Sequence, residues 1–269
     1  MKTRLLFIVN VSALSLLLAA TSHAALTTNS WINSSGKWET NAATYWTQGV
    51  PSPNHSAILI TNAGTKTVTI DNVTVASNAV NECLTISNLT VQGFGAGINT
   101  LQLTNTGASG LLVLDKLSVG TKGVLQVTDS NLRLSRPGGT NLVIDGTITL
   151  QSGSLIVTNL DTQVTVGNTT NGNLVVIGGT LIAEKIQVAS VPGSAGELVL
   201  WGGTNTVNFL DVGSFDAPGT FVLNGGELTT TGTEVGYGGI WSCVRERWYV
   251  ACRLSVSGVG RCFRGDGGH

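Results

Sequence analysis

Two acidic residues, Asp211 and Glu234, have the spacing that best suits a cation-binding or catalytic site. They are separated by one period of the repeat described below, and each directly precedes a valine. Two carboxylates held side by side can bind a divalent cation or act as acid and base in glycoside hydrolysis. When the repeats are aligned one below the other, Asp115, Asp161 and Glu184 fall near the position of this pair, but not in consecutive repeats. We therefore expect a solvated pair on an outer face, and we assign no catalytic, cofactor-binding or metal-ligating residue.

The histidines and the glycine-rich loops add no further site. His23 lies in the N-terminal leader and His269 is the last residue, which leaves His55 alone in the body of the chain. A multi-histidine metal site or a Ser-His-Asp triad is therefore not expected. Residues 93–97 are rich in glycine, but they complete neither a dinucleotide fingerprint nor a P-loop, and no helix pattern follows them.

The composition favours strands and tight turns. The chain has 269 residues with 35 Gly, and 42% of its residues are hydrophobic while only 11% are charged. Thr, Val, Leu, Asn, Ser and Gly dominate, so a helical bundle is not expected. Residues 25–240 carry seven basic and thirteen acidic side chains. Because phosphate neutralisation needs a Lys/Arg footprint, we expect no nucleic-acid partner.

Residues 1–24 have the features of a secretory signal peptide. Lys2 and Arg4 precede an apolar run over residues 5–20, and small residues at Ser22 and Ala24 mark a cleavage site. The apolar run is short for a bilayer span and contains polar residues. We therefore expect a secreted or cell-surface protein with no transmembrane span after removal of this segment.

Two sets of markers repeat through the chain with the same period. Glycines that precede alternating apolar residues occur at 123, 146, 172, 196 and 219. A second series, mostly Val-Gly, starts at 119, 143, 166, 188, 212 and 235. Successive markers are separated by nearly the same interval in both series. A regular period of this length with about three strand-like runs per unit is typical of a solenoid.

These repeats predict an all-β fold, a right-handed parallel β-helix (β-solenoid) with roughly 23 residues per coil, over residues 64–240. Alternation assigns the side chains to the two sides of each strand. Leu198 and Leu200 point inward, and Glu197, Val199 and Trp201 point outward. The same parity places further side chains in the core, namely Leu125, Val127, Leu174, Val176, Phe221 and Leu223.

The predicted register also positions the corners and the acidic pair. The residue immediately before each marker of the second series should occupy the same position in every coil. In the coils before Asp211, these residues are Ser118, Leu142, Thr165 and Gln187. Asp211 and Glu234 then stack on adjacent coils. The Gly-Gly pairs at 178/179, 202/203 and 225/226 suit sharp corners that need a positive φ.

Residues 25–63 are expected to form an aromatic N-terminal cap. Trp31, Trp38 and Trp46 lie here together with Tyr45. A solenoid must cover its first coil, and a tryptophan cluster is well suited to that task. The alternative interpretation is a platform on which sugar rings stack.

The opening residues carry a resemblance to a known class. The order Trp-Gly-Trp-Trp-Gly-Pro at 31, 36, 38, 46, 49 and 51 is followed by Ala57–Ile60 and Lys66–Ile70. Together with the Gly-x-Leu-x-Val repeats, it resembles secreted bacterial β-solenoid proteins of the autotransporter-passenger and PEP-CTERM surface type, over roughly residues 30–240. The resemblance implies a parallel β-helix displayed outside the cell in adhesion or as a stalk, and it implies no catalytic residue.

The residues from 241 to 269 depart from this pattern. They include three of the four cysteines, at 243, 252 and 262, and five of the fourteen basic residues, but no Asn or Thr. The translocating barrel and the Pro-Glu-Pro ending of the two resembled classes are absent from this sequence. One hypothesis is a disulfide-bonded C-terminal cap. The other is a tail read out of frame after a shift near Ile240.

The sequence thus favours a non-catalytic secreted or cell-surface β-solenoid that acts as a structural stalk, adhesin-like scaffold or matrix component. Its expected partners are cell-surface or matrix glycans or proteins, and no cofactor is expected. One alternative is a polysaccharide lyase or hydrolase, because parallel β-helices often cut acidic polysaccharides. Another is a glycan-binding module that uses exposed aromatic side chains such as Trp201.

Overall fold

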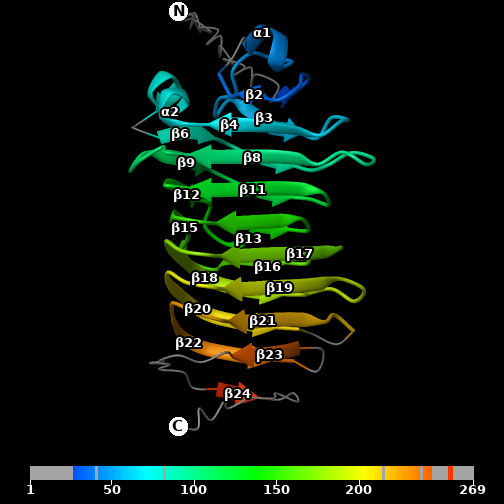
Figure 1. Cartoon of the computed structure of the whole chain (residues 1–269), viewed down its shortest axis with the longest axis vertical. Coiled ribbons are helices and arrows are strands. Elements are labelled where there is room, and N and C mark those ends of the chain that lie inside the picture. Colours follow the sequence, from blue (N-terminus) through cyan, green and yellow to red (C-terminus); the bar gives the residue numbers. More distant parts are fainter. Residues whose placement is uncertain are drawn as a thin grey trace, which may run out of the picture.

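The computed structural model describes residues 27–39, 42–80, 83–213, 216–236, 239–243 and 254–256. The predicted signal peptide, residues 1–24, lies outside this part of the chain. The structure is all-β, with 57% strand and 5% helix, and its parallel strands stack as a β-solenoid of about 8 turns with about 24 residues per turn. The coils form one rod with the first described strands at one end and β24 (Leu254–Val256) at the other (Figure 1). The predicted fold class is confirmed.

One side of the rod, here called face III, is a nine-stranded parallel sheet. It contributes one strand to each coil. Its strands in order are β2 (Gly36–Lys37), β4 (Lys66–Ile70), β8 (Asn99–Thr104), β11 (Gly123–Thr128), β14 (Thr147–Leu150), β17 (Asn171–Val176), β19 (Ala195–Leu200), β21 (Gly219–Leu223) and β23 (Gly239–Cys243).

The other two sides, faces I and II, join into one fifteen-stranded sheet. Face I contains β1 (Thr27–Ser30), β3 (His55–Ile60), β7 (Leu89–Val91), β10 (Leu117–Val119), β13 (Gly139–Ile144), β16 (Thr162–Val166) and β24. Face II contains β5 (Ala79–Val80), β6 (Cys83–Ile86), β9 (Gly110–Val113), β12 (Ser130–Leu134) and β15 (Gly153–Val157). Three nine-residue strands bend through both faces, namely β18 (Thr180–Val188), β20 (Thr204–Val212) and β22 (Glu227–Val235).

The register of face III follows the glycine markers. Gly172, Gly196 and Gly219 pair in successive strands, so the first marker series is correctly aligned. In the second series, however, Val119 pairs with Ile144 and not with Val143. The pairing of β13 with β16 shifts between Thr140 and Leu142, where an irregularity adds a residue. Spacing along the chain could not reveal this slip, because Val143 and Ile144 are both β-branched.

The interior is a stack of mostly aliphatic side chains. All eight side chains predicted to point inward are at most 1% exposed, from Leu125 in β11 to Leu223 in β21. In-register neighbours on face III include Leu174, Leu198 and Phe221, which follow one another in one column. Burial of such a side chain contributes about 1.5–3 kcal/mol, so stacked coils stabilise one another although a single coil would not be stable.

The Gly-Gly corners serve two purposes. In each pair the second glycine has a positive φ, 80° at Gly179, 79° at Gly203 and 77° at Gly226. This confirms the predicted role. The first glycine is needed for a different reason, because a Cβ at Gly225 would lie 2.2 Å from the carbonyl oxygen of Trp201 in the preceding coil. Close approach of coils therefore excludes side chains at this position.

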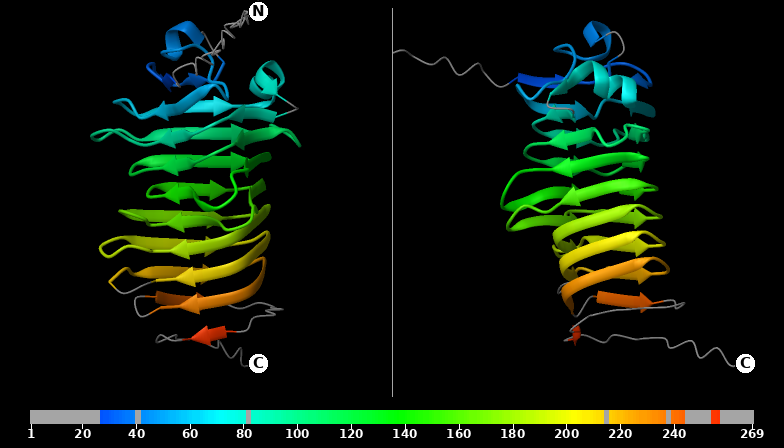
Figure 2. Two further views of the ribbon diagram at one scale, coloured as in Figure 1. Left: turned by 180° about the vertical axis from the view of Figure 1, so that it is seen from behind. Right: turned by 90° about the vertical axis from the view of Figure 1, so that its left-hand side faces the viewer.

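Two coils have enlarged corners between faces II and I. Residues 135–138 connect β12 to β13, and residues 158–161 connect β15 to β16, whereas β18, β20 and β22 run through the same corner without a break. The two loops contact each other through a hydrogen bond from the Gly138 N–H to the Leu160 carbonyl oxygen, at 2.9 Å. They project beyond the strands that follow them (Figure 2, right).

The N-terminal end is closed by more elements than the sequence indicates. The short helix α1 (Ala42–Tyr45) and the strands β1 and β2 fall in the predicted cap. A second helix, α2 (Asn72–Asn78), lies between β4 and β5, inside the range that was predicted to be solenoid, and it buries Thr74 and Val75. Strand β5 then pairs with β6 in an antiparallel manner. Both helices lie at the N-terminal end of the rod (Figure 1).

At the opposite end, parallel pairing extends past residue 240. Strand β23 pairs with β21, and β24 pairs with β22. The spacing shortens here, because the interval from Gly219 to its partner Gly239 is smaller than the general repeat of about 24 residues per turn. Cys252 and Cys262 lie outside the described residues, so the two hypotheses for the tail remain predictions.

Candidate functional site

The tryptophan cluster of the cap is buried. Trp31, Trp38 and Trp46 are 1%, 0% and 1% exposed. Their rings pack edge to face, with centroids 5.1 Å apart for Trp31 and Trp46 and 4.7 Å apart for Trp38 and Trp46. The Trp46 indole N–H donates to the Trp38 carbonyl oxygen at 2.8 Å. Because no ring face is open to solvent, these residues cover the core as a plug, and the sugar-platform interpretation is wrong for them.

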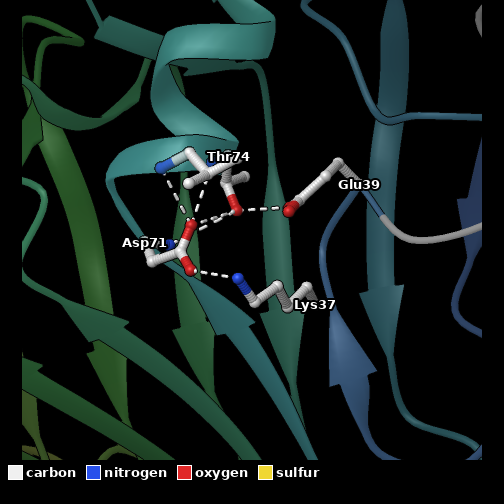
Figure 3. A network of polar contacts seen from close by, with 5 residues as sticks. Lys37, Glu39, Asp71 and Thr74 are labelled. Carbon is white, nitrogen blue, oxygen red and sulfur yellow. Dashed lines mark hydrogen bonds and ion pairs between the residues drawn. The ribbon is translucent and has the colours of Figure 1, made fainter.

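A polar network connects this cap to α2 (Figure 3). Asp71 precedes α2 and accepts hydrogen bonds from the Val73 and Thr74 N–H groups, both at 3.0 Å, as an N-cap does. The Lys37 Nζ lies 2.7 Å from the other carboxylate oxygen of Asp71. The Thr74 hydroxyl donates to Glu39. Lys37 and Glu39 of the cap thus contact Asp71 and Thr74 at the start of α2, and these contacts hold α2 against the cap.

The charges in this network shift the pKa of Asp71. Partial burial by itself would raise that pKa, but the hydrogen bonds from Lys37 and Thr74 and the charge of Lys37 outweigh burial and hold it below its usual value. The same contact raises the pKa of Lys37. Both groups are therefore charged at neutral pH, which suits a structural ion pair and not a proton donor or acceptor.

His55 is held by a local turn. Its Nδ1 accepts a hydrogen bond from the Ser52 N–H at 3.0 Å and lies 3.2 Å from the Ser52 hydroxyl oxygen. Its Nε2 lies 3.4 Å from the Asn29 amide nitrogen. The Ser52 N–H therefore contacts the same ring nitrogen that faces the Ser52 hydroxyl. The contacts of His55 thus fix the turn into β3.

The predicted acidic pair forms as expected. Asp211 in β20 and Glu234 in β22 are direct neighbours in register, on strands about 4.8 Å apart. Asp211 is half-buried and Glu234 is exposed. Burial raises the pKa of the Asp211 carboxyl, the charge of Lys185 lowers it, and the charge of Glu234 raises it further, so that it lies above its usual value.

The column that leads to this pair differs at one position from the prediction. Ser118 is followed by Val143 and not by Leu142, and then by Thr165 and Gln187. The slip at the β13 irregularity accounts for the difference. Leu142 is instead an inward residue with no exposed surface.

A charged side chain, Lys185, and an aromatic ring, Phe209, lie near Asp211. Phe209, two residues earlier on the same side of β20, has the Lys185 Nζ 5.4 Å from its ring centroid. Its ring lies over Gly232 in the next coil. The other acids of the sequence analysis do not join this group, because Asp115 pairs with Arg136 at 2.6 Å and Glu184 accepts from Asn208. Asp161 lies in the exposed loop before β16.

No three His, Cys, Asp or Glu side chains gather into a possible metal site within the described residues. The two acidic side chains Asp211 and Glu234, with Lys185 nearby, form a small charged cluster on an outer face. Their arrangement can bind a polar ligand weakly or simply remain solvated.

Trp201 is on the surface, as predicted. It follows β19 at a Gly-Gly corner and is 55% exposed. Ile177, the equivalent residue of the preceding coil, is 50% exposed. Next to them, the outward position of face III is valine in three consecutive strands, at Val175, Val199 and Val222. We call these five residues the valine-tryptophan patch.

This patch was not identified from the sequence, although a signal for it exists. Outward parity had assigned Val199 and Trp201 to the surface, and the same parity applied to β17 and β21 would have found the other members. Elsewhere along the same column the outward residues are polar, namely Thr69, Gln102, Gln126 and Thr149. The patch is therefore an apolar interruption of a polar face.

Comparisons of the chain with protein-family models, with curated proteins and with solved structures found no match. In the part of the chain that the structure describes, no helix is long and apolar enough to cross a bilayer. The class that fold and surface define is a parallel β-solenoid with a plugged N-terminal end.

Proposed function

We propose that this chain is a non-catalytic, exported β-solenoid that acts as a structural stalk, an adhesin-like scaffold or a matrix component. One observation carries the proposal, which is the uninterrupted apolar column inside the rod. On face III it runs through Val68, Leu101, Leu125, Ile148, Leu174, Leu198 and Phe221, each at most 1% exposed. A rod whose coils are joined by a continuous core and by parallel strand pairing resists bending and separates its two ends.

The surface chemistry supports the same proposal. The body of the chain is sparsely charged and mildly acidic, which suits contact with neutral glycans or proteins better than contact with nucleic acid. The resemblance to autotransporter passengers and PEP-CTERM surface proteins also favours a location outside the cell. We expect cell-surface or matrix glycans or proteins as partners.

Export is tested by expressing the whole chain in a bacterial host and sequencing the N-terminus of the recovered protein. The expected product begins after Ala24 and is found in the envelope or the medium. A matched chain with Lys2 and Arg4 replaced by Glu should be exported poorly, because the positive n-region is lost. Retention of the unprocessed wild-type chain in the cytosol would contradict the proposal.

Catalysis is tested by incubating the exported protein with pectins, alginates and neutral glycans and measuring new reducing ends and unsaturated products. We expect no turnover, and saturable binding without turnover would favour the adhesin-like role. Turnover that is lost in Asp211→Asn and Glu234→Gln but kept in Glu227→Gln would overturn the proposal and identify an enzyme that uses the stacked pair.

A further inference from the structure

The exposed apolar surface of the valine-tryptophan patch is concentrated at one corner of the rod. Val199 is only 8% exposed, so the valine stripe is a nearly covered floor. Trp201 and Ile177, by contrast, are 55% and 50% exposed. The three tryptophans of the cap are buried, so among the described side chains Trp201 is the exposed indole ring. An open ring of this size on a sparsely charged face is typical of a contact site.

Trp201 lies in a column of three corner residues. The N–H groups of Ile177, Trp201 and Asn224 each donate to a carbonyl oxygen of the preceding coil, at 2.8, 2.8 and 2.7 Å, so these residues are equivalent in consecutive coils. The Gly-Gly pairs 178/179, 202/203 and 225/226 follow them directly. Because glycine has no side chain, that side of the column is bare backbone in all three coils. The corner is therefore a narrow strip, about 10 Å long, with Trp201 at its centre.

Polar groups beside the ring are available to a ligand. Asn224 follows Trp201 one coil further along the rod and is half-buried. Within the described residues, neither the side-chain amide of Asn224 nor the indole N–H of Trp201 has a hydrogen-bond partner. An amide supplies both a donor and an acceptor, and the indole supplies a donor. An aromatic surface next to such groups suits a ligand that carries C–H groups and hydroxyls together.

The charge around this corner disfavours an acidic ligand. Lys185 is the one basic residue from 137 to 240, and it lies on face I, where its Nζ is over the Phe209 ring. Glu197 precedes Trp201 by four residues, and Glu227 follows Asn224 by three. An acidic polysaccharide would meet carboxylates here without a compensating cation. Charge complementarity therefore selects a neutral ligand.

We infer that Trp201 binds a neutral glycan, with one pyranose ring stacked on the indole face and a hydroxyl of the same glycan bonded to Asn224. Pyranoses whose hydroxyls are equatorial, as in β-1,4-linked glucose or N-acetylglucosamine, present flat C–H faces that match an indole ring. The inference rests on the proposed function, because it specifies which of the expected partners the exported rod binds.

The test is isothermal titration calorimetry of the exported protein with cellohexaose and with chitohexaose. We expect at least one of them to bind with a Kd of about 0.1–1 mM, because the site is shallow and has one ring. Trp201→Ala should raise this Kd about tenfold or more, since it removes the stacking surface. Asn224→Ala should raise it about threefold, since it removes one hydrogen bond.

Phe94→Ala is the matched control. Phe94 is also an exposed aromatic residue, at 64%, but it lies in the loop between β7 and β8, outside the patch. Its substitution should change the Kd less than about twofold. Thermal unfolding verifies that all three variants remain folded, which is expected because each alters an exposed or half-buried side chain.

Absence of binding by both hexaoses at about 10 mM, or equal weakening by Trp201→Ala and Phe94→Ala, would overturn the inference. Tighter binding of polygalacturonate than of either hexaose would also contradict it, because the site would then prefer an acidic chain. These failures leave the proposed function intact, since export and turnover are measured separately. Release of shorter sugars during the titration, followed by chromatography, would instead overturn the non-catalytic function and leave the binding site in place.

Discussion

Asp145 and Asp211 lie on the same rod but in opposite electrostatic environments. Asp145 is buried and accepts hydrogen bonds from the N–H groups of Asn168 at 2.7 Å, Thr169 at 2.8 Å and Thr170 at 3.2 Å. Burial raises its pKa, but these bonds and that from the Thr169 hydroxyl outweigh burial and hold the pKa below its usual value. Among the described residues, no such set of donors surrounds Asp211, and its pKa is raised.

The two groups predict opposite effects of substitution. At pH 7, Asp145→Asn should lower the free energy of unfolding by about 2 kcal/mol, because the charged acceptor is lost. Asp211→Asn should raise it slightly, because a disfavoured charge is removed. Urea unfolding at several pH values measures both effects.

The pH dependence follows from the direction of each shift. The stability that Asp145 contributes is present above the unfolded-state pKa of about 4 and is lost as the pH falls toward the lower folded-state pKa. The penalty from Asp211 disappears as the pH falls from neutral through its raised folded-state pKa toward about 4. Two variants that change stability in the same direction at pH 7 would show that one of these assignments is incorrect.

Inward and outward positions should respond very differently to mutation. Leu198→Asp places an unpaired charge in a column with no exposed surface, and we expect a loss of about 4 kcal/mol or more. Glu197→Ala, one residue earlier and pointing outward, should change the stability by less than about 0.5 kcal/mol. Thermal unfolding of dilute protein compares them, and equal shifts in Tm would contradict the observed parity.

At the scale of an element, the corners show where pattern analysis succeeds and where it ends. The sequence predicted that the Gly-Gly pairs turn the chain with positive φ, and the second glycine of each pair does so. It did not predict that both glycines of each pair also lie too close to the backbone of the preceding coil to carry a Cβ. Local preference explains the first role, but the second depends on the distance between coils.

These two contributions can be separated by substitution. Gly193 and Gly203 have similar positive φ values of 84° and 79°, but a Cβ meets nothing within 4 Å at Gly193 and the Gly179 carbonyl oxygen at 2.4 Å at Gly203. Gly193→Ala should cost about 1–2 kcal/mol from backbone strain alone. Gly203→Ala should cost clearly more, as measured by chemical unfolding. Similar losses would mean that the coils can separate locally without penalty.

The enlarged corner at 135–138 has a further consequence for prediction. It is followed by the irregularity in β13 that shifts Val143 against its neighbours, so the predicted column contained Leu142 in error. Periodic markers locate strands to within a residue, but a one-residue slip exchanges the two sides of a strand. Only the pairing itself shows which residue lies inside.

At the scale of the whole molecule, the solenoid should tolerate removal of one coil. Deletion of residues 172–195 joins Asn171 to Gly196, which occupies the same register position as Gly172. Because each coil contacts mainly its neighbours, the shortened chain should still fold with a β-type circular dichroism spectrum and a lower Tm. Deletion of residues 172–183 is the control, because half a coil destroys the register. Equal behaviour of the two deletions would contradict nearest-neighbour stacking.

Periodicity by itself determined the parallel solenoid, the inward side chains and the stacked pair Asp211 and Glu234, and the tryptophan spacing indicated the location of the cap. Periodicity could do so because identical positions of successive coils lie in direct contact, so one local pattern is repeated at every level of the core. The burial of the three cap tryptophans, the helix α2, the enlarged corners and the valine-tryptophan patch were decided by the tertiary structure. They depend on how far side chains of different coils cover one another and on corner lengths that vary from coil to coil, which alternation along a single strand does not record.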